Sequence, residues 1–248
     1  MLTDAGFELI QSVFTRAELE ALELSGGDAG VRSLLDVGTI REFARDERLL
    51  RMAGRGAFAV RAILFDKSSD ANWALGWHQD SSIAVMERAD VEGFGPWTTK
   101  DEVPHAIAPV ALLESMISLR VHLDDCGEDN GPLRVIAGSH RFGRMTAAQI
   151  STLVECDGRG SHQVGRVNAT QVSEPAERGH LDERSSQLSD AGSRAEATSC
   201  LAASGDVLAF KPLLLHASSS ARVVSHRRVL QFEYAFGPLP APLRWRWS

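Results

Sequence analysis

Six apolar segments of the chain are typical of buried β-strands, and this succession constrains the fold more than any other feature. Turn residues separate the segments, and no helix-length pattern alternates with them as a parallel sheet would require. A shorter strand is predicted at 7–13. The sequence therefore predicts a mainly β protein with two packed sheets. The six predicted strands are 57–66, 72–85, 115–125, 132–140, 206–218 and 227–236.

Helices are predicted to flank these sheets. The sequences TRAE at 15–18 and TAAQ at 146–149 have the pattern of a capping box or a polar N-cap, in which a threonine begins a helix. Residues 39–53 carry apolar side chains at helical spacing. The helix that starts at 146 is expected to end near residue 155.

Residues 157–199 interrupt the pattern of strands. These 43 residues contain only five bulky apolar side chains and no aromatic one. Such a segment buries too little surface to offset its ordering entropy, so we expect a largely disordered insertion between two strands of a single domain spanning 1–248. A mobile lid is the alternative interpretation.

Charge and cysteine content limit the partners that we expect. Lys and Arg number 26 against 33 Asp and Glu, giving a net charge of −7, and no basic cluster indicates nucleic-acid or membrane binding. No apolar run approaches the length of a membrane span. The three cysteines lie far apart and no leader is evident, which favours the cytoplasm. A monomer or homodimer that binds a small molecule is expected.

The segment GWHQDSS at 76–82 combines strand-like neighbours with two metal-binding side chains. In a strand, His78 and Asp80 share one face, and the neighbours on that face are small. His216 ends another apolar segment and is the best third ligand. Two histidines and one carboxylate leave positions open on the metal, as in non-haem Fe(II) oxygenases. A surface pair or a hydrogen-bonded core histidine is the alternative, and His122 with Asp124 has the same spacing.

An iron site of this kind needs a cation for the distal carboxylate of 2-oxoglutarate. Arginine suits this role because its guanidinium binds a carboxylate through two hydrogen bonds. The strand after His216 offers Arg227 and Arg228, which point to opposite faces. Arg227 points inward if the apolar face packs on helices, but alternation alone leaves both residues open.

Three blocks of sequence resemble one known family. These blocks are RAILFDK…WALGWHQD, LRVHLDDCGEDNGPLRVIAGSHR and GDVLAFKPLLLHASSS…RRVLQFEYA. They resemble the phytanoyl-CoA dioxygenase (PhyH-like) family of Fe(II)/2-oxoglutarate-dependent oxygenases over about 57–145 and 200–247, but not over 157–199. The resemblance implies a double-stranded β-helix, a jelly-roll or cupin-like core.

The resemblance also implies roles for individual residues. His78, Asp80 and His216 would bind Fe(II), which reacts with 2-oxoglutarate and dioxygen. The family's co-substrate arginine falls on Arg227. The carboxylate at position 80 favours hydroxylation, with release of succinate and CO2, over halogenation. Ser218 would be a second contact to the co-substrate, and Arg120 is a weaker candidate.

The region 87–109 follows the metal-bearing segment and is expected to be a long loop. It is placed to cover the mouth of the site and to contact the substrate through Trp97, Lys100 and His105, or it is a surface loop packed by its own aromatics. Two other functions stay open. A non-catalytic jelly-roll protein that binds a small molecule would consume no 2-oxoglutarate. A cupin-like metal-dependent hydrolase or isomerase would work without dioxygen and would have no use for Arg227.

Overall fold

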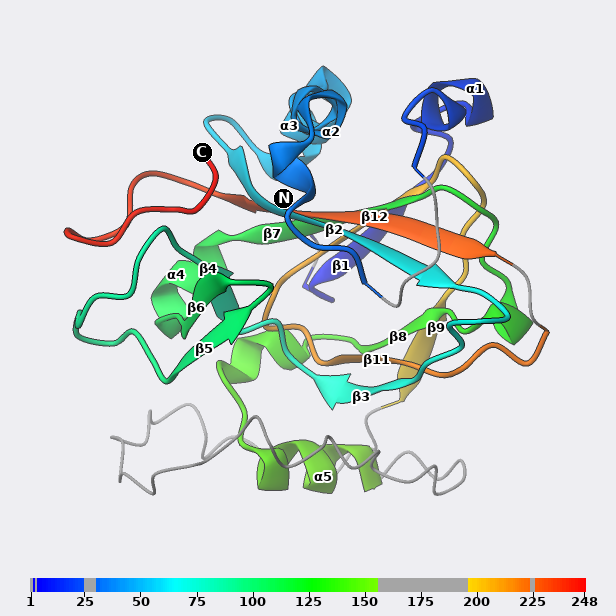
Figure 1. The fold of residues 1–248 in the computed structure, drawn as a ribbon. Helices are drawn as coiled ribbons and strands as arrows, with labels where there is room; N and C mark the ends of the chain where they lie inside the picture. The colour runs from blue at the N-terminus through cyan, green and yellow to red at the C-terminus, as the bar shows by residue number, and fades with distance from the viewer. Residues whose placement is uncertain (1, 3, 25–29, 156–195, 224–225) are drawn as a thin grey trace.

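The computed structural model describes residues 2, 4–24, 30–155, 196–223 and 226–248, and its strands form three antiparallel sheets (Figure 1). The five-stranded sheet has the order β1-β10-β7-β12-β2, the four-stranded sheet β3-β11-β8-β9, and the three-stranded sheet β4-β6-β5. The strands are β1 Phe7–Ile10, β2 Phe58–Lys67, β3 Leu75–His78, β4 Ser82–Ala84, β5 Trp97–Lys100, β6 Val103–Ile107, β7 Ile117–His122, β8 Leu133–Ile136, β9 Ala197–Cys200, β10 Val207–Phe210, β11 His216–Ser218 and β12 Arg227–Ala235.

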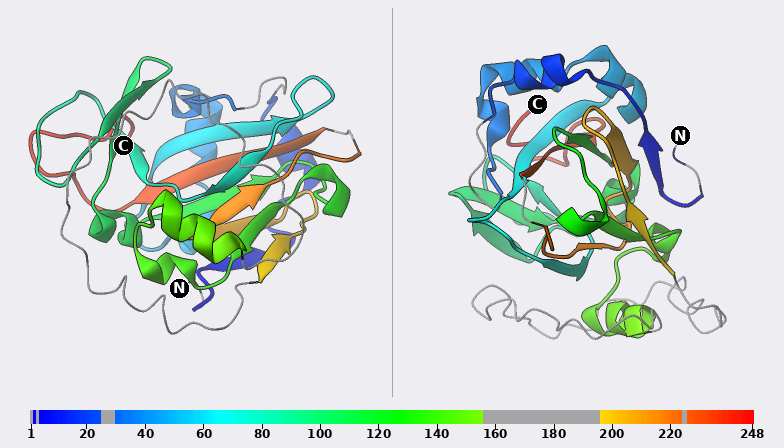
Figure 2. Two further views of the ribbon diagram at one scale, coloured as in Figure 1. Left: turned by 90° about the horizontal axis from the view of Figure 1, so that it is seen from below. Right: turned by 90° about the vertical axis from the view of Figure 1, so that its right-hand side faces the viewer.

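The two larger sheets face each other, and helices cover the outer side of the five-stranded sheet (Figures 1 and 2). Helix α5 lies beyond the four-stranded sheet (Figure 1). The expected mainly β fold with flanking helices and a jelly-roll core is therefore confirmed. None of the described helices is long and apolar enough to cross a membrane. The helices are α1 Arg16–Glu20, α2 Gly38–Phe43, α3 Glu47–Ala53, α4 Val110–Ser115 and α5 Ala147–Glu155, with 3-10 turns η1 Leu34–Asp36, η2 Glu128–Asn130 and η3 Ser139–Phe142.

Strand β12 divides its side chains between two environments. Its even-numbered residues Leu230, Phe232 and Tyr234 are fully buried in the main core under the helices, where the ring of Phe43 lies 6.1 Å from that of Phe232. The odd-numbered residues face the opposite sheet. Arg227 therefore points into the space between the sheets, as the packing of an apolar face on helices predicts.

The only tyrosine of the chain joins this strand to the helices. The Tyr234 hydroxyl is buried and donates a hydrogen bond of 2.7 Å to the carbonyl oxygen of Ala44, the residue that ends α2. Tyr234→Phe leaves that carbonyl without its partner, so we expect the free energy of unfolding to fall by about 1–2 kcal/mol. Urea denaturation monitored by circular dichroism measures the change. A loss below about 0.3 kcal/mol would show that water replaces the hydroxyl.

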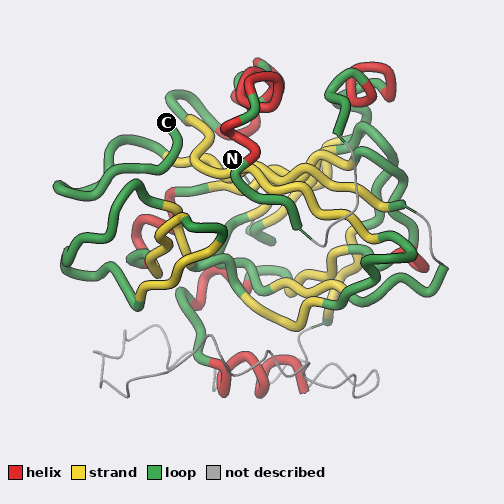
Figure 3. Tube along the Cα trace, in the orientation of Figure 1, coloured by secondary structure: helices red, strands yellow, loops and turns green. Residues whose placement is uncertain are grey.

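Two of the predicted strands are wrong as single elements, because the chain changes sheets within each (Figure 3). The segment 72–85 forms β3 in the four-stranded sheet and β4 in the three-stranded sheet. The segment 206–218 forms β10 in the five-stranded sheet and β11 opposite it. Gln79 holds the first corner: its amide donates to the carbonyl oxygens of Gly143 and Leu213, at 2.9 and 2.7 Å. Asp80 consequently lies just after β3, not within a strand.

Smaller differences have local causes. The helix expected over 39–53 is two helices, because Asp46 adopts an extended conformation and caps α3 by accepting from the backbone N–H of Arg48 at 2.8 Å. The region 87–109 is not simply a loop, since 97–107 forms the β5–β6 hairpin. The segment expected as strand 132–140 becomes η3 after Gly138, whose φ of 76° ends β8's extended path.

The polar insertion lies mostly outside the described residues. The disorder expected for this segment falls on residues 156–195, which lie outside the residues that the structure describes. Residues 197–199, at the end of the predicted insertion, instead belong to β9, which pairs with β8 from Ala197 to Cys200.

The capping patterns predicted at 15–18 and 146–149 are both present, since Thr15 and Thr146 each accept from the backbone N–H three residues later.

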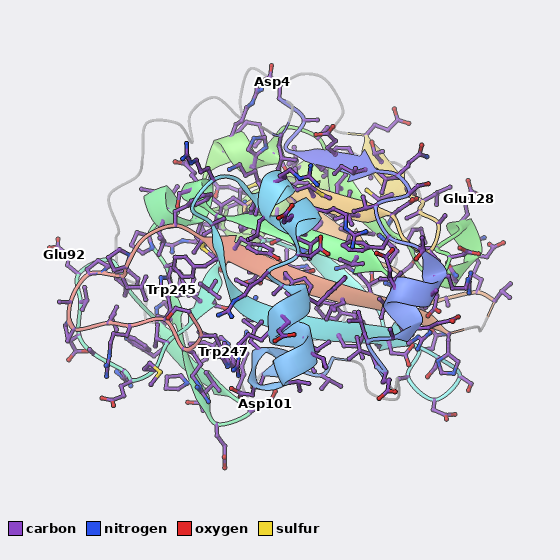
Figure 4. The ribbon with its side chains drawn as sticks, turned by 90° about the horizontal axis from the view of Figure 1, so that it is seen from above. Asp4, Glu92, Asp101, Glu128, Trp245 and Trp247 are labelled. Atoms are coloured by element: carbon purple, nitrogen blue, oxygen red, sulfur yellow. The ribbon has the colours of Figure 1, made fainter. Side chains whose placement is uncertain are left out.

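The C-terminal tail packs on the chain itself. Trp245 and Trp247 are both buried and lie beside one another at one edge of the molecule (Figure 4). Trp245 forms a β-bridge with Val85, and the indole N–H of Trp247 donates to Asp36 at 2.8 Å. The tail thereby connects the three-stranded sheet to the helical layer.

Candidate metal centre and active site

The structure brings together the three residues that the sequence proposed as metal ligands. His78 ends β3 and His216 begins β11, and the two are direct partners across these strands. One potential ligand atom from each of His78, Asp80 and His216 lies within 4.8 Å of the other two. No other group of this kind is found in the described part of the chain. Among the described residues the His122–Asp124 pair gathers no third ligand, and Asp124 instead binds Arg228.

Both histidines present the same ring nitrogen to the centre. Nδ1 of His78 lies 2.8 Å from the carbonyl oxygen of Gly76, and Nδ1 of His216 lies 2.8 Å from that of Leu214. Nδ1 therefore carries the proton, and the Nε2 lone pair is free for a metal. The two Nε2 atoms lie 3.9 and 3.8 Å from the oxygens of Asp80, so the lone pairs and the carboxylate converge.

Asp80 is fixed from two sides. Its backbone N–H donates to the carbonyl oxygen of Pro212 at 2.9 Å, and the side-chain amide of Gln231 donates to Oδ2 at 3.3 Å. The amide oxygen of Gln231 in turn accepts from Arg120 at 2.9 Å. This chain of hydrogen bonds orients the carboxylate, as outer residues commonly do around metals.

The protonation states at the centre suit a divalent cation. Burial acts to raise the pKa of Asp80, but His216, His78 and nearby guanidinium groups outweigh burial and lower it. Burial, together with His78, lowers the pKa of His216 to about 4. At neutral pH the centre therefore offers the neutral imidazole of His216 and the carboxylate of Asp80. The side chains of His78 and Asp80 are 31% and 19% exposed, so the centre opens to solvent on their side.

A cluster of buried cations lies next to this centre. Arg227 is 1% exposed and donates to the carbonyl oxygen of Gly131 at 3.1 Å. Lys67, its partner on β2, is 0% exposed; it donates to the hydroxyl of Ser218 at 2.8 Å and to the carbonyl oxygen of Ser219. A Cβ on Gly131 would lie 2.9 Å from the Lys67 ammonium, so glycine permits this close approach.

Arg120 completes the cluster and also donates a hydrogen bond to Gln231, which contacts Asp80. Its guanidinium lies 5.2 Å from the ring of Phe65. Within the described residues, the Nε atoms of Arg120 and Arg227 have no hydrogen-bond partner, and no carboxylate lies at ion-pair distance from either arginine or from Lys67. Burial and the nearby Arg227 lower the pKa of Arg120 to about 10. Cations buried without counter-charge indicate an anion-binding site.

Lys67 is a residue of the candidate site that was not predicted from the sequence. The residue ends the apolar segment RAILFDK, and only the pairing of β2 with β12 shows that it lies opposite Arg227. Reasoning also missed Gln231 and the buried ion pair between Arg61 and Glu233. The available signals were Lys67 at the end of an apolar segment, and Gln231 and Glu233, which share the parity of Arg227 on β12.

The three residues proposed for substrate contact do not form one group. Lys100 and His105 share a face of the three-stranded sheet, as their register with Thr98 shows. Trp97 has the opposite parity and packs in the hydrophobic cluster behind that sheet, with Arg88 5.8 Å from its ring. Trp97 therefore does not face the same space as the other two.

Comparisons with known proteins agree with this fold. The sequence pattern of the phytanoyl-CoA dioxygenase (PhyH) family matches residues 37–229. HygX from Streptomyces hygroscopicus with iron bound is 17% identical with a TM-score of 0.55, over 94% of this chain and 83% of that one. EctD from S. alaskensis with bound Fe is 17% identical with a TM-score of 0.60, over 96% and 76%. The carbocyclase SnoK from nogalamycin biosynthesis is 11% identical with a TM-score of 0.56, over 95% and 81%. No curated protein sequence matches the chain significantly.

Proposed function

The chain belongs to the phytanoyl-CoA dioxygenase (PhyH) family, and from this premise we propose that it is an Fe(II)- and 2-oxoglutarate-dependent dioxygenase that hydroxylates a small molecule. The observation that carries the proposal is the juxtaposition of His78, Asp80 and His216 with the cationic cluster of Lys67, Arg120 and Arg227. A protein that only binds metal has no need of the cluster, and one that only binds an anion has no need of the ligands.

The residues present fit an iron ion. Two imidazole Nε2 atoms and one carboxylate form the ligand set of Fe(II) oxygenases, which leaves coordination positions for a co-substrate and dioxygen. HygX has also been crystallised with nickel and 2-oxoglutarate bound. A bound iron supplies the centre at which dioxygen and 2-oxoglutarate yield succinate and CO2 while the substrate C–H bond becomes C–OH. The carbonyl oxygens of Gly76 and Leu214 and the amide of Gln231 hold the three ligands in place.

The cationic cluster fits the distal carboxylate of 2-oxoglutarate. Arg227 has a free Nε and a guanidinium that can bind a carboxylate through two hydrogen bonds. Ser218 and Lys67 lie beside it and offer a hydroxyl and an ammonium. A metal-dependent hydrolase has no use for such a pocket, and Asp80 occupies the position that halide would need. These observations favour oxidation with hydroxyl transfer.

The test is an anaerobic titration of the purified protein with Fe(II) and 2-oxoglutarate. We expect a weak visible charge-transfer band from the chelate, followed by succinate formation when dioxygen is admitted. Absence of the band in folded, iron-loaded protein would contradict the proposal and favour a non-catalytic binding protein. Turnover of a substrate without dioxygen would favour a hydrolase or isomerase.

The affinity for 2-oxoglutarate is expected to depend on pH through Lys67. Burial, then Arg227 and Arg120, lower the pKa of Lys67 to about 7, while Cys126 acts slightly in the other direction. A bound carboxylate favours the protonated ammonium, so the complex holds more protons than the free protein above pH 7. The dissociation constant should therefore be constant below pH 6.5 and rise by up to about tenfold per pH unit above 7.5.

Calorimetry of the iron-loaded protein between pH 6 and 9 measures this dependence. In Lys67→Met the dependence should disappear, because the remaining arginines of the cluster stay charged in this range. A slope that persists in Lys67→Met would assign the titration to another group.

A further inference from the structure

The inner face of the five-stranded sheet has two polar ends with the metal centre between them. Gln231, near the middle of β12, contacts Asp80. Arg227 lies four residues before Gln231 on the same face, and Glu233 lies two residues after it, about 7 Å further along the strand. Arg61 pairs with Glu233 across the strands. If 2-oxoglutarate occupies the Arg227 end, the Arg61–Glu233 end is left for the substrate.

That end contains buried polar atoms without partners. Arg61 and Glu233 form an ion pair and are both buried. The Nε atom of Arg61 and the hydroxyl of Ser118, the cross-strand neighbour of Glu233, have no hydrogen-bond partner among the described residues. Leaving a buried donor unsatisfied is energetically costly, so a polar ligand is expected to complete this end.

Lys100 brings an uncompensated positive charge to the same end. Its ammonium contacts the hydroxyl of Ser82 at 3.4 Å, and within the described ranges no carboxylate lies at ion-pair distance. Burial, then Arg61 and Arg32, lower its pKa. Arg32 is paired with Asp101 at the tip of the hairpin (labelled in Figure 4), at 3.6 Å, and Arg61 is paired with Glu233. Lys100 is thus the charge that a ligand has to neutralise.

His105 supplies an acceptor on the same face. Its Nδ1 lies 2.9 Å from the carbonyl oxygen of Val103, so Nδ1 carries the proton and Nε2 has a free lone pair. Burial lowers the pKa of His105 to about 4, against a smaller opposing effect of the Val103 hydrogen bond. The imidazole is neutral at pH 7 and can accept a hydrogen bond from a hydroxyl or amino group.

We propose that Lys100, His105, Ser118 and the Arg61–Glu233 pair form the substrate subsite, and that the substrate is a small polar molecule with one anionic group for Lys100 and a hydroxyl or amino group for Glu233 or His105. This inference rests on the proposed oxygenase function. An unbroken hydrocarbon substrate would leave Arg61 Nε and Ser118 Oγ unpaired. The partial exposure of His78, Asp80, Ser82 and Lys100 marks the side from which the substrate enters.

The test uses three small probes on the anaerobic protein loaded with Fe(II) and 2-oxoglutarate. The probes are 3-hydroxybutyrate, butane-1,3-diol and choline, which are anionic, neutral and cationic and each carry a hydroxyl. We expect calorimetry to give a dissociation constant for 3-hydroxybutyrate at least about tenfold below those of the other two. Lys100→Met should abolish this preference while leaving the affinity for 2-oxoglutarate within about twofold of the wild type.

Arg88→Met is the matched control, because it removes an exposed cation that lies over Trp97, on the opposite face of the same sheet from Lys100. The preference should persist in this variant. Equal affinities in the wild type, or a preference that survives Lys100→Met, would overturn the subsite. So would competition between 3-hydroxybutyrate and 2-oxoglutarate, which would place the probe in the Arg227 pocket. The charge-transfer band is measured before any probe is added. If the band is absent, the proposed oxygenase function fails, and the substrate subsite loses its basis.

Discussion

His216→Ala is expected to abolish the Fe(II)·2-oxoglutarate charge-transfer band and to weaken iron binding by more than about a hundredfold. The substitution removes one of three protein ligands, and the remaining pair of His78 and Asp80 is partly exposed to competing water. Equilibrium dialysis with Fe(II), or with Co(II) as an air-stable substitute, measures the affinity directly. The band measures assembly of the complete chelate.

His122→Ala is the control for loss of a buried histidine. His122 faces the same interior from β7 and has a lowered pKa of about 3 through burial and the neighbouring Arg120, but it lies outside the ligand group. Both variants lose comparable buried volume, whereas only His216→Ala should lose the metal. Equal loss of iron in the two variants would show that the interior collapses without either ring, and the ligand assignment would fail.

Arg227→Met is expected to weaken the binding free energy of 2-oxoglutarate by about 2–5 kcal/mol, which raises its dissociation constant roughly thirty- to several-thousandfold. The guanidinium is fully buried, so its hydrogen bonds to a carboxylate are not screened by water. Iron binding should change little, because Arg227 contacts none of the three ligands. Titration of the charge-transfer band with 2-oxoglutarate at saturating iron separates the two effects.

The adjacent arginine provides a matched control. Arg228 lies on the other face of β12 and binds Asp124 at 2.8 and 2.9 Å. Arg228→Met should lower stability slightly and leave the affinity for 2-oxoglutarate unchanged. If the two variants weaken co-substrate binding equally, the loss reflects disturbance of the strand and not removal of a carboxylate contact.

The candidate metal ligands could be proposed from sequence because ligation demands particular side chains. Histidine and aspartate inside apolar segments are conspicuous whatever the local geometry, so His78, Asp80 and His216 emerged even though the strand expected over 72–85 is wrong. The sheet-switching corners could not be read in the same way. Strand-like residues resume after the polar residues 79–81, and apolar residues continue through 213–215, so periodicity does not record at which residue the chain passes from one sheet to the other.

The residues that were missed depend on pairing between strands distant in sequence. Lys67 matters because it lies opposite Arg227, and Arg61 because it lies opposite Glu233; both relations follow from the β2–β12 register. A single sequence carries the parity of each strand but not the register between strands. Parity alone left Arg227 and Arg228 both open, and the packing of Leu230, Phe232 and Tyr234 in the core under the helices shows that Arg227 lies on the opposite, inner face.

The division of β12 into two faces has a consequence for protein engineering. Substitutions at Leu230, Phe232 and Tyr234 act on the core, whereas substitutions at the odd-numbered positions would act on the proposed recognition of co-substrate and substrate, so each property can be varied with little cost to the other. Libraries aimed at new substrates should therefore diversify Glu233 together with Arg61, its partner across the strands, and leave Phe232 and Tyr234 alone. A deletion of one residue within the strand exchanges the two faces, and natural variation by that route is expected to be lethal to the fold.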